Sequence, residues 1–437
     1  MAAAARRVSA ASASSAAAGL AHGPLEGIRV LDLSRILAGP YCTMMLGDLG
    51  AEVIKVEAVA GGDPTRKWGP PFAERIDDTD EASESAYFLC VNRNKSSIAV
   101  DFKSERGVAL IKALAAVSDV VVENFVPGKL AQLGLDFDSL APGNTRGGLI
   151  YASITGFGPD GPLATRAGYD VIAAGMGGLM GITGEADGPP VKVGVAITDI
   201  ATGMLAQGAI SSALLARERG LAPPEGQKVD LSLFETQLAC LVNIGSNYLI
   251  GGKNGKRWGT AHESIVPYQA FPTADDDGYI IVGATTDAQF AKLAAALHDE
   301  LPQLADAPEL FGTNALRVAH REELVGLLSS FTAIRTTAEC EAFFASLGLA
   351  TGPINSMDEA FANPQVAARD MVATIDHPTA GPVSLVGLPV KYSATPGSIR
   401  LPPPLHGEHT RSVLESTLNL SAAEIDQLIA DAVVKAV

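Results

Sequence analysis

The sequence predicts an α/β fold in which a large domain with a doubly wound, largely parallel sheet is combined with a smaller central α+β domain. Three observations lead to this prediction. Short β-branched runs alternate with helical segments between residues 28 and 154, which is the pattern of parallel strands joined by helices. A proline and glycine cluster at 219–226 interrupts the alternation. Beyond it, a hairpin pattern at 268–282 precedes three helical segments.

The elements of the first region follow in a regular order. Strands are expected at 28–33, 52–57, 97–101, 120–123 and 148–154, and helices at 39–50, 85–91 and 107–117. The helix at 39–50 has a proline near its start and a glycine at its end, as helix termini favour. Because ligands of such sheets bind beyond the carboxyl ends of the strands, we expect the functional residues there.

The second region begins after the proline and glycine cluster. A strand-like run at 229–234 leads into a long helix at 235–249, and further helices are expected at 288–297, 322–331 and 338–347. The two hairpin strands, 268–271 and 279–282, flank an acidic turn. These patterns predict a large domain at 24–224, a small domain at 225–350, and a C-terminal part, 351–437, that returns to the large domain.

The composition sets limits on the partners. The chain has 437 residues, of which 47% are hydrophobic, and this is enough to form two cores. Its 32 basic and 49 acidic residues give a net charge of −17, which argues against general affinity for nucleic acid or an anionic membrane. We interpret the four cysteines as reduced thiols, because they are far apart and form no CxxC pair: Cys42, Cys90, Cys240 and Cys340.

Residues 1–23 have the composition of an organelle transit peptide. They are rich in alanine and serine, contain Arg6 and Arg7, and have no acidic residue; the first one is Glu26. A disordered tail is the alternative. No stretch reaches the ~18 uninterrupted apolar residues of a membrane span.

Three segments suggest ligand sites but lack the required residues. In the glycine-rich run 175–181, Met180 occupies the third glycine position of a dinucleotide-binding loop. The run 251–257 has the wrong spacing for a phosphate-binding P-loop and no Ser or Thr. His406 and His409 have no further ligands beside them, so we predict no metal site.

The run 194–203 contains the most informative acid of the chain. Here an apolar segment opens onto a helix with Asp199 at the junction. A helix N-terminus favours the ionised form of an acid. From the residues alone, Asp199 is either a carboxylate nucleophile or a helix cap.

Six short runs, in order along nearly the whole chain after residue 24, resemble the class III CoA-transferase family, also called the formyl-CoA transferase or CaiB/BaiF family. They are Val30-Leu-Asp-Leu-Ser-Arg-Ile-Leu-Ala-Gly-Pro40, Gly50-Ala-Glu-Val-Ile-Lys-Val-Glu57, Asn92-Arg-Asn-Lys95, Glu123-Asn-Phe-Val-Pro-Gly128, Ala167-Gly-Tyr-Asp170 and Gly407-Glu-His-Thr410. Together they are far more specific than any one of them.

The resemblance implies a Rossmann-like large domain built from both chain ends, a small central domain, and a homodimer of interlocked rings. It places the family's catalytic aspartate on Asp199, with Tyr169 and Asp170 nearby. The implied reaction uses a CoA thioester as co-substrate and needs no prosthetic group or metal.

The resemblance also implies the CoA contacts. Carried over by motif, they are Leu37, Ala38, Val100, Lys103, Asn124 and Phe125. Two positions that are basic in the formyl-transferase branch are Ala58 and Gln132 here, so phosphate binding must be redistributed, with Arg166 and Lys129 as candidates.

The acceptor is expected to be a dicarboxylate. The run of consecutive glycines in the formyl-transferase branch is absent, and its place is taken by the region around Arg257 and His262. A second carboxylate favours an arginine partner, for which Arg93 and Arg257 are candidates, and His262 is a candidate donor. The implied activity moves CoA from succinyl-CoA to glutarate, 3-hydroxy-3-methylglutarate, malate or itaconate in mitochondria.

Two other functions remain open at this point. The first is a 2-methylacyl-CoA racemase, which Tyr169 disfavours because racemases of this fold carry a histidine there, and a phenol with a pKa of about 10 is poorly suited to proton transfer. The second is a non-catalytic CoA-binding protein.

Overall fold

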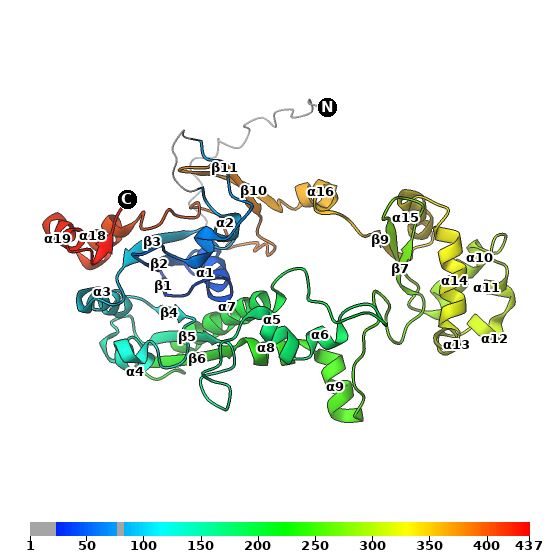
Figure 1. Cartoon of the computed structure of the whole chain (residues 1–437), viewed down its shortest axis with the longest axis horizontal. Helices are drawn as coiled ribbons and strands as arrows, with labels where there is room; N and C mark the ends of the chain where they lie inside the picture. Colours follow the sequence, from blue (N-terminus) through cyan, green and yellow to red (C-terminus); the bar gives the residue numbers. More distant parts are fainter. Residues whose placement is uncertain (1–22, 77–82) are drawn as a thin grey trace. The chain divides into compact units, whose positions relative to one another are not determined.

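The computed structural model describes residues 23–76 and 83–437. They are divided between two compact units (Figure 1). The first unit contains the chain up to Asp170, Ile197–Thr236 and Asp370–Val437. The second contains Val171–Ala196 and Gln237–Arg369.

A seven-stranded sheet forms the centre of the first unit. Its strands are β1 (Arg29–Asp32), β2 (Glu52–Ala58), β3 (Lys95–Val100), β4 (Val120–Glu123), β5 (Leu149–Thr155), β6 (Gly226–Ser232) and β12 (Val434–Lys435). Their order is β12-β3-β2-β1-β4-β5-β6, and all neighbours are parallel except β12, which is antiparallel to β3. This confirms the predicted parallel α/β sheet. The strand order reverses between β1 and β4, which is where doubly wound sheets bind ligands.

Helices cover both faces of this sheet. They are α1 (Ala38–Asp48), α2 (Ala86–Leu89), α3 (Glu105–Ala116), α4 (Phe137–Leu140), α7 (Ile197–Glu218), α18 (Thr410–Leu418) and α19 (Ala422–Ala430), with 3₁₀ turns η1 (Pro64–Lys67), η2 (Ala131–Leu133) and η3 (Ala141–Gly143). Helices α1 and α7 pack against each other, whereas α3, α18 and α19 contribute to the apolar core on the sheet. Strands β4 and β5 are buried at every position, as expected for a parallel sheet covered on both sides. A separate antiparallel pair, β10 (Val372–His377) and β11 (Gly381–Val386), completes the unit.

The second unit contains a three-stranded antiparallel sheet and most of the short helices. Its strands are β7 (Tyr268–Pro272), β8 (Tyr279–Gly283) and β9 (Ala350–Pro353), in that order. The predicted hairpin is confirmed, and β9 adds a third strand to it. The helices are α5 (Asp170–Met176), α6 (Leu179–Ile182), α9 (Val242–Gly251), α10 (Asp287–Ala296), α11 (Gln303–Asp306), α12 (Pro308–Phe311), α13 (Asn314–Ala319), α14 (Arg321–Thr332), α15 (Thr337–Ser346), α16 (Met357–Ala362) and α17 (Pro364–Ala368).

The predicted long helix at 235–249 is wrong. The structure has two helices there, α8 (Leu233–Cys240) and α9, separated at Leu241. Val242, at the start of α9, has a φ of 43°, in the left-handed region that a β-branched residue rarely adopts. The chain therefore changes direction where the apolar pattern is continuous.

The bounds of the units differ from the predicted division in three places. Residues 171–196 belong to the second unit, and the return to the first unit begins at Asp370 rather than at 351. Strand β6 belongs to the first unit because it pairs with β5 along its whole length. The proline and glycine cluster at 219–226 is thus the turn between α7 and β6, and the predicted boundary there is displaced.

In the described residues, no helix is long and apolar enough to cross a membrane. Residues 1–22 of the predicted transit peptide lie outside the described part of the chain.

Candidate active site

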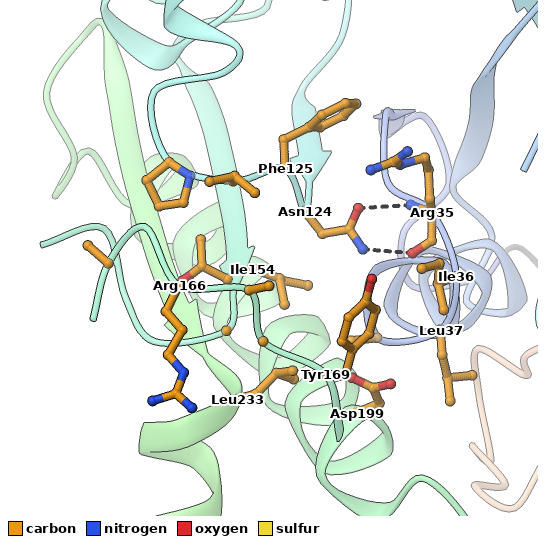
Figure 2. A pocket seen from close by; sticks show the side chains of 18 residues that line it. Arg35, Ile36, Leu37, Asn124, Phe125, Ile154, Arg166, Tyr169, Asp199 and Leu233 are labelled. Atoms are coloured by element: carbon orange, nitrogen blue, oxygen red, sulfur yellow. Dashed lines mark hydrogen bonds between the residues drawn. The ribbon is translucent and has the colours of Figure 1, made fainter. Parts of the chain in front are cut away.

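A cavity of about 170 Å³ lies in the first unit (Figure 2). It is bounded by the loops after β1, β4 and β5, by residues 164–169, and by the first turn of α7. The loops after β1 and β4 meet here because the strand order reverses between these strands. The labelled lining residues in Figure 2 are Arg35, Ile36, Leu37, Asn124, Phe125, Ile154, Arg166, Tyr169, Asp199 and Leu233.

Acidic side chains at the strand ends fix the loops that follow them. Asp32 accepts a hydrogen bond from the backbone N–H of Ser34 at 2.9 Å, and Glu123 accepts one from Phe125 at 2.7 Å. Asp101, directly after β3, accepts one from Lys103 at 3.0 Å. In each case the acid binds the amide two residues later, which stabilises a tight turn.

The loop after β1 is held in an unusual conformation. Ile36 has a φ of 73°, a strained value for a β-branched residue. Its N–H donates to the carboxylate of Asp63 at 3.2 Å, and this buried carboxylate also forms an ion pair with Lys55 at 3.0 Å. Lys55 in turn donates to the carbonyl of Ser34 at 3.0 Å. The buried ion pair of Lys55 and Asp63 therefore holds the backbone of Ser34 and Ile36, and Ile36 is part of the cavity wall.

Asn124 joins the loops after β1 and β4 directly. Its amide oxygen accepts from the N–H of Arg35 at 2.9 Å, and its amide nitrogen donates to the Arg35 carbonyl at 2.7 Å, as the dashed lines in Figure 2 show. The two bonds satisfy both polar backbone groups of Arg35 and fix the spacing between the loops.

Asp199 lies in the first turn of α7. The Asp170 carboxylate accepts hydrogen bonds from the N–H groups of Thr198 at 2.7 Å and Asp199 at 3.2 Å, so Asp170 acts as the cap of this helix. A Cβ atom on Gly203 would lie 2.7 Å from the carbonyl oxygen of Ala38. This glycine therefore permits the close approach of α7 to the start of α1, which brings Asp199 to the cavity.

The carboxylate of Asp199 has an environment that disfavours its charge. Burial, and then the negative charge of Asp170, raise the pKa of Asp199 from 3.8 to about 7. An ionised, poorly solvated carboxylate is a better nucleophile than one that water or a cation stabilises.

Tyr87, in α2, also lies near this carboxylate. Burial, and then the negative charge of Asp199, raise the pKa of Tyr87 to about 12. The phenol therefore stays protonated and can donate a hydrogen bond. Its ring packs edge-to-face on Trp68, with 5.2 Å between the ring centroids. Tyr87 could not be identified from the sequence, because a tyrosine in a short helix carries no signal of which residues lie near it.

The structure brings most of the predicted residues of the large domain together. Leu37, Ala38, Asn124, Phe125, Arg166, Tyr169 and Asp199 line one cavity, and Asp170 contacts the helix that carries Asp199. In Figure 2, Tyr169 lies beside Asp199, whereas the Arg166 guanidinium points away from Asn124. Val100 is fully buried in the core and Lys103 is exposed; neither lines this cavity.

The geometry of Arg93 weighs against its predicted role as a substrate ligand. Its side chain is 4% exposed. The guanidinium forms two hydrogen bonds to Asp48, at 2.9 and 2.7 Å, and a third to the carbonyl of Val386 at 2.7 Å. Arg93 thus joins the end of α1 to β11, which is a structural function.

Arg257 and His262 lie in the second unit. Arg257 donates to the carbonyl of Gly181 at 3.4 Å. The ring of His262 stacks on Tyr268 with 5.4 Å between centroids, and its Nδ1 accepts from the N–H of Ser264 at 3.0 Å. Their roles in substrate binding stay predictions.

Among the described residues, no group of three or more His, Cys, Asp and Glu side chains is arranged to hold a metal ion. The Nε2 of His406 donates a hydrogen bond to the carbonyl of Ala58 at 2.9 Å. The polar side chains that line the cavity are the Asp199 carboxylate, the Tyr169 phenol, the Asn124 amide, and those of Arg35, Arg166 and Thr155.

Three comparisons of this chain with known proteins give consistent results. Residues 25–410 match the model of CoA-transferase family III. The chain is similar to a protein of Mus musculus named succinyl-CoA:glutarate CoA-transferase, with 50% identity over 415 residues that cover 94% of this chain and 90% of that protein. The Homo sapiens protein of the same name is 49% identical, with coverage of 94% and 90%. A crystal structure of a CaiB/BaiF family protein from Brucella suis is 41% identical, with a TM-score of 0.79 and coverage of 93% of this chain and 100% of that one.

Proposed function

The chain belongs to CoA-transferase family III and is an enzyme of this class, and from this we propose that it moves CoA from succinyl-CoA to glutarate or a related dicarboxylate. The names of the mouse and human relatives support this choice of donor and acceptor. The acceptors 3-hydroxy-3-methylglutarate, malate and itaconate belong to the same proposal.

In the proposed mechanism Asp199 is the nucleophile. Its carboxylate attacks the thioester carbonyl of succinyl-CoA, the C–S bond breaks, and a succinyl–aspartyl anhydride and the CoA thiolate result. The thiolate attacks the aspartyl carbonyl, which gives an aspartyl–CoA thioester and releases succinate. Glutarate attacks this thioester to form a second anhydride and the thiolate. Attack of the thiolate on the glutaryl carbonyl yields glutaryl-CoA and restores the carboxylate.

The observation that carries this proposal is the state of Asp199 in its cavity. The carboxylate lines the cavity from the first turn of α7, with Tyr169 in the same wall and Asp170 bound to the N–H of Asp199, and burial and the charge of Asp170 raise its pKa to about 7. Tyr169, which lines the same cavity as Asp199, is available to donate to the oxygen of a tetrahedral intermediate.

The assembly and location also belong to the proposal. The enzyme is an interlocked homodimer whose large domain is built from both chain ends. Exposed apolar side chains on α9, Leu249 at 83% and Ile250 at 89%, support a partner surface in the second unit. The alanine- and serine-rich first residues, with Arg6 and Arg7, support import into the mitochondrial matrix. Arg257 and His262 remain the candidate ligands for the distal carboxylate of the acceptor.

Mass spectrometry tests the central step. After brief incubation with succinyl-CoA alone, the peptide that contains Asp199 should carry a CoA adduct, and the Asp199→Ala variant should bind CoA but form no adduct. An adduct on another residue, or its persistence in the variant, would exclude this mechanism. Turnover measured over the four dicarboxylates then ranks the acceptors. Exchange of an α-proton with heavy water in the absence of any acceptor would instead support a racemase.

A further inference from the structure

Residues 258–266 of the second unit form an irregular segment that leads into β7. Because this segment belongs to no helix or sheet, its backbone polar groups need other partners. The carbonyls of His262, Glu263, Ser264 and Val266 all accept hydrogen bonds from side chains, at 2.7–3.0 Å. These side chains come from α13 and from the first residue of α14, a helix that packs against β7 (Figure 1). They are Asn314, Arg317 and Arg321, and together they hold the segment.

The two arginines of this group differ in their other contacts. Arg317 is completely buried and also donates to Asp287 at 2.8 Å, so it is part of the core of the unit. Arg321 is partly exposed, and its Nη2 donates to the His262 carbonyl at 3.0 Å and to the Glu263 carbonyl at 2.8 Å. In the described residues its guanidinium forms no ion pair. Arg321 therefore binds the backbone of one short segment rather than an acid.

The segment is also held ahead of His262. The guanidinium carbon of Arg321 lies 5.0 Å from the centroid of the Trp258 ring, and a cation over the face of a tryptophan is attracted by the ring. The Oγ1 of Thr260 accepts a hydrogen bond from the N–H of Ala270 in β7 at 3.1 Å. Contacts on both sides of His262 thus fix its backbone, and Arg321 takes part on each side.

The imidazole of His262 has a defined orientation and a defined proton. Its ring stacks on Tyr268 with 5.4 Å between the centroids and 3° between the planes, and its backbone N–H donates to the Tyr268 carbonyl at 2.9 Å. Its Nδ1 accepts from the N–H of Ser264 at 3.0 Å, so in the neutral ring the proton is on Nε2. Across residues 23–76 and 83–437, no hydrogen bond engages this Nε2. The Nε2–H group is therefore an oriented donor that is available to a ligand.

We propose that Arg321 is a positioning residue for recognition of the acceptor acid: it holds the backbone at residues 262 and 263 so that the Nε2–H of His262 donates to the distal carboxylate. This inference rests on the proposed function, in which His262 is a candidate ligand of that carboxylate. A hydrogen bond to a carboxylate is charge-assisted, and a donor that is fixed in advance loses little conformational freedom on binding. Arg321 itself does not contact the acceptor and acts through His262.

The test compares two five-carbon acids, glutarate and pentanoate, of which only glutarate has a distal carboxylate. Succinyl-CoA is held at one saturating concentration. His262→Phe keeps a ring over Tyr268 and removes the donor, and it should lower kcat/KM for glutarate roughly 10- to 100-fold. Arg321→Met leaves the donor present but no longer fixed, and it should lower kcat/KM roughly 5- to 20-fold, mainly through KM. The inhibition constant of pentanoate against glutarate should be unchanged in both variants.

A double variant and a matched arginine separate positioning from general stability. When His262→Phe is combined with Arg321→Met, the loss should equal that of His262→Phe alone, because Arg321 acts through the histidine. Arg321→Lys, which keeps a donor for a carbonyl, should recover part of the loss. The control is Arg335→Met in the same unit. Arg335 also lies over an aromatic ring, 3.8 Å from the centroid of Phe331, and donates to the Phe331 carbonyl at 2.7 Å and to Glu300, so its loss should leave the constants for both acids unchanged.

Nitrogen-15 NMR of the imidazole adds a measurement that does not depend on turnover. The His262 signals, assigned by their absence in His262→Phe, should show the Nε2–H form in the wild type and in Arg335→Met, and a mixture of both neutral tautomers in Arg321→Met. Where Arg321→Met does not fold, Arg321→Lys carries the same comparisons with a smaller change.

Four results would overturn the inference: equal losses with glutarate and pentanoate, multiplicative losses in the double variant, an unchanged Arg321→Met, or the Nδ1–H form of His262 in the wild type. The first two would indicate that Arg321 has a structural role only. If the wild type transfers no CoA to any acid, the proposed function fails, and the tautomer of His262 in Arg321→Met still shows whether Arg321 positions the imidazole.

Discussion

Two carboxylates of the first unit, Asp32 and Asp199, are both largely removed from water, but their surroundings shift their pKa values in opposite directions. Asp32 is completely buried at the end of β1, and it binds Lys95 at 3.1 Å, Thr43 at 2.7 Å and the backbone of Ser34. Burial opposes its charge, but the nearby lysines and hydroxyls lower its pKa overall. Asp199 has an acid, Asp170, as its charged neighbour, and its pKa rises to about 7.

These environments distinguish an acid that stabilises the fold from one that is available for chemistry. The network of Asp32, Lys95, Lys55 and Asp63 uses its charges to fix the loop at 34–37, and removing one member leaves another charge buried alone. Asp170 and Asp199 instead place two negative charges close together beside the cavity. Such a pair lowers stability and is retained where reactivity requires it.

The largest expected effect is on the activity of Asp199→Asn. An amide cannot form the acyl intermediates, so transfer of CoA to glutarate should fall by at least roughly 1,000-fold. Far-ultraviolet circular dichroism and CoA binding should be retained, because the amide has the size of the acid. Residual transfer within tenfold of the wild type would show that another group is the nucleophile.

The second effect is on the free energy of unfolding. Asp32→Ala leaves the ammonium of Lys95 buried without its carboxylate, and we expect a loss of about 3–5 kcal/mol. Denaturant unfolding measures it. Asp32→Asn combined with Lys95→Met, which removes both charges, should recover much of the loss. The matched control is Glu52→Ala, which removes the surface ion pair with Arg29 and should cost less than about 1 kcal/mol. Equal losses for the buried and the surface pair would contradict the comparison.

The fold could be predicted from the sequence where local pattern and burial agree. Strand 120–123 was predicted with the bounds that β4 has, because its three consecutive valines strongly favour a buried strand. Strand β9 was not predicted, since Ala350–Pro353 contains a glycine and a proline and becomes a strand only by pairing with β8. The break between α8 and α9 was missed for the same reason: tertiary contacts, rather than periodicity, determine it.

The candidate site was predictable through its motifs but not through its interactions. Leu37 and Asn124, which lie in runs that carry the family resemblance, line one cavity with Asp199, and their roles in CoA binding stay predictions. The hydrogen bond from the N–H of Ile36 to Asp63 joins residues 27 positions apart, and the pairing of Arg93 with Asp48 joins residues 45 positions apart. Neither interaction can be predicted from sequence spacing. Arg35 lies within a quoted motif, yet only the structure shows that its guanidinium carbon lies 4.9 Å from the centroid of the Phe125 ring.

A smaller effect is expected on the pH profile of Asp170→Asn. The amide oxygen can still accept from Thr198 and Asp199, whereas the negative charge that raises the pKa of Asp199 is lost. The acid limb of kcat/KM, which follows ionisation of the nucleophile, should therefore move to lower pH. Profiles between pH 5 and 9 measure this shift, with Asp138→Asn, an exposed acid of α4, as the control. A limb that stays in place, or that moves to higher pH, would show that Asp170 does not act through its charge.

The smallest effect is on thermal stability. Because the pKa of Asp199 is raised from 3.8 to about 7 in the folded state, the fold retains a proton that the unfolded chain has already lost. The stability contributed by this group is complete below pH 4 and is lost as the pH rises towards and through 7. Asn has no charge to bury, so the Tm advantage of Asp199→Asn over the wild type should be larger at pH 8 than at pH 5. Asp138→Asn should show the same Tm difference at both values. A pH-independent difference for Asp199→Asn would mean that the carboxylate is as well solvated in the fold as in the unfolded chain, and that its position at the cavity carries no cost in stability.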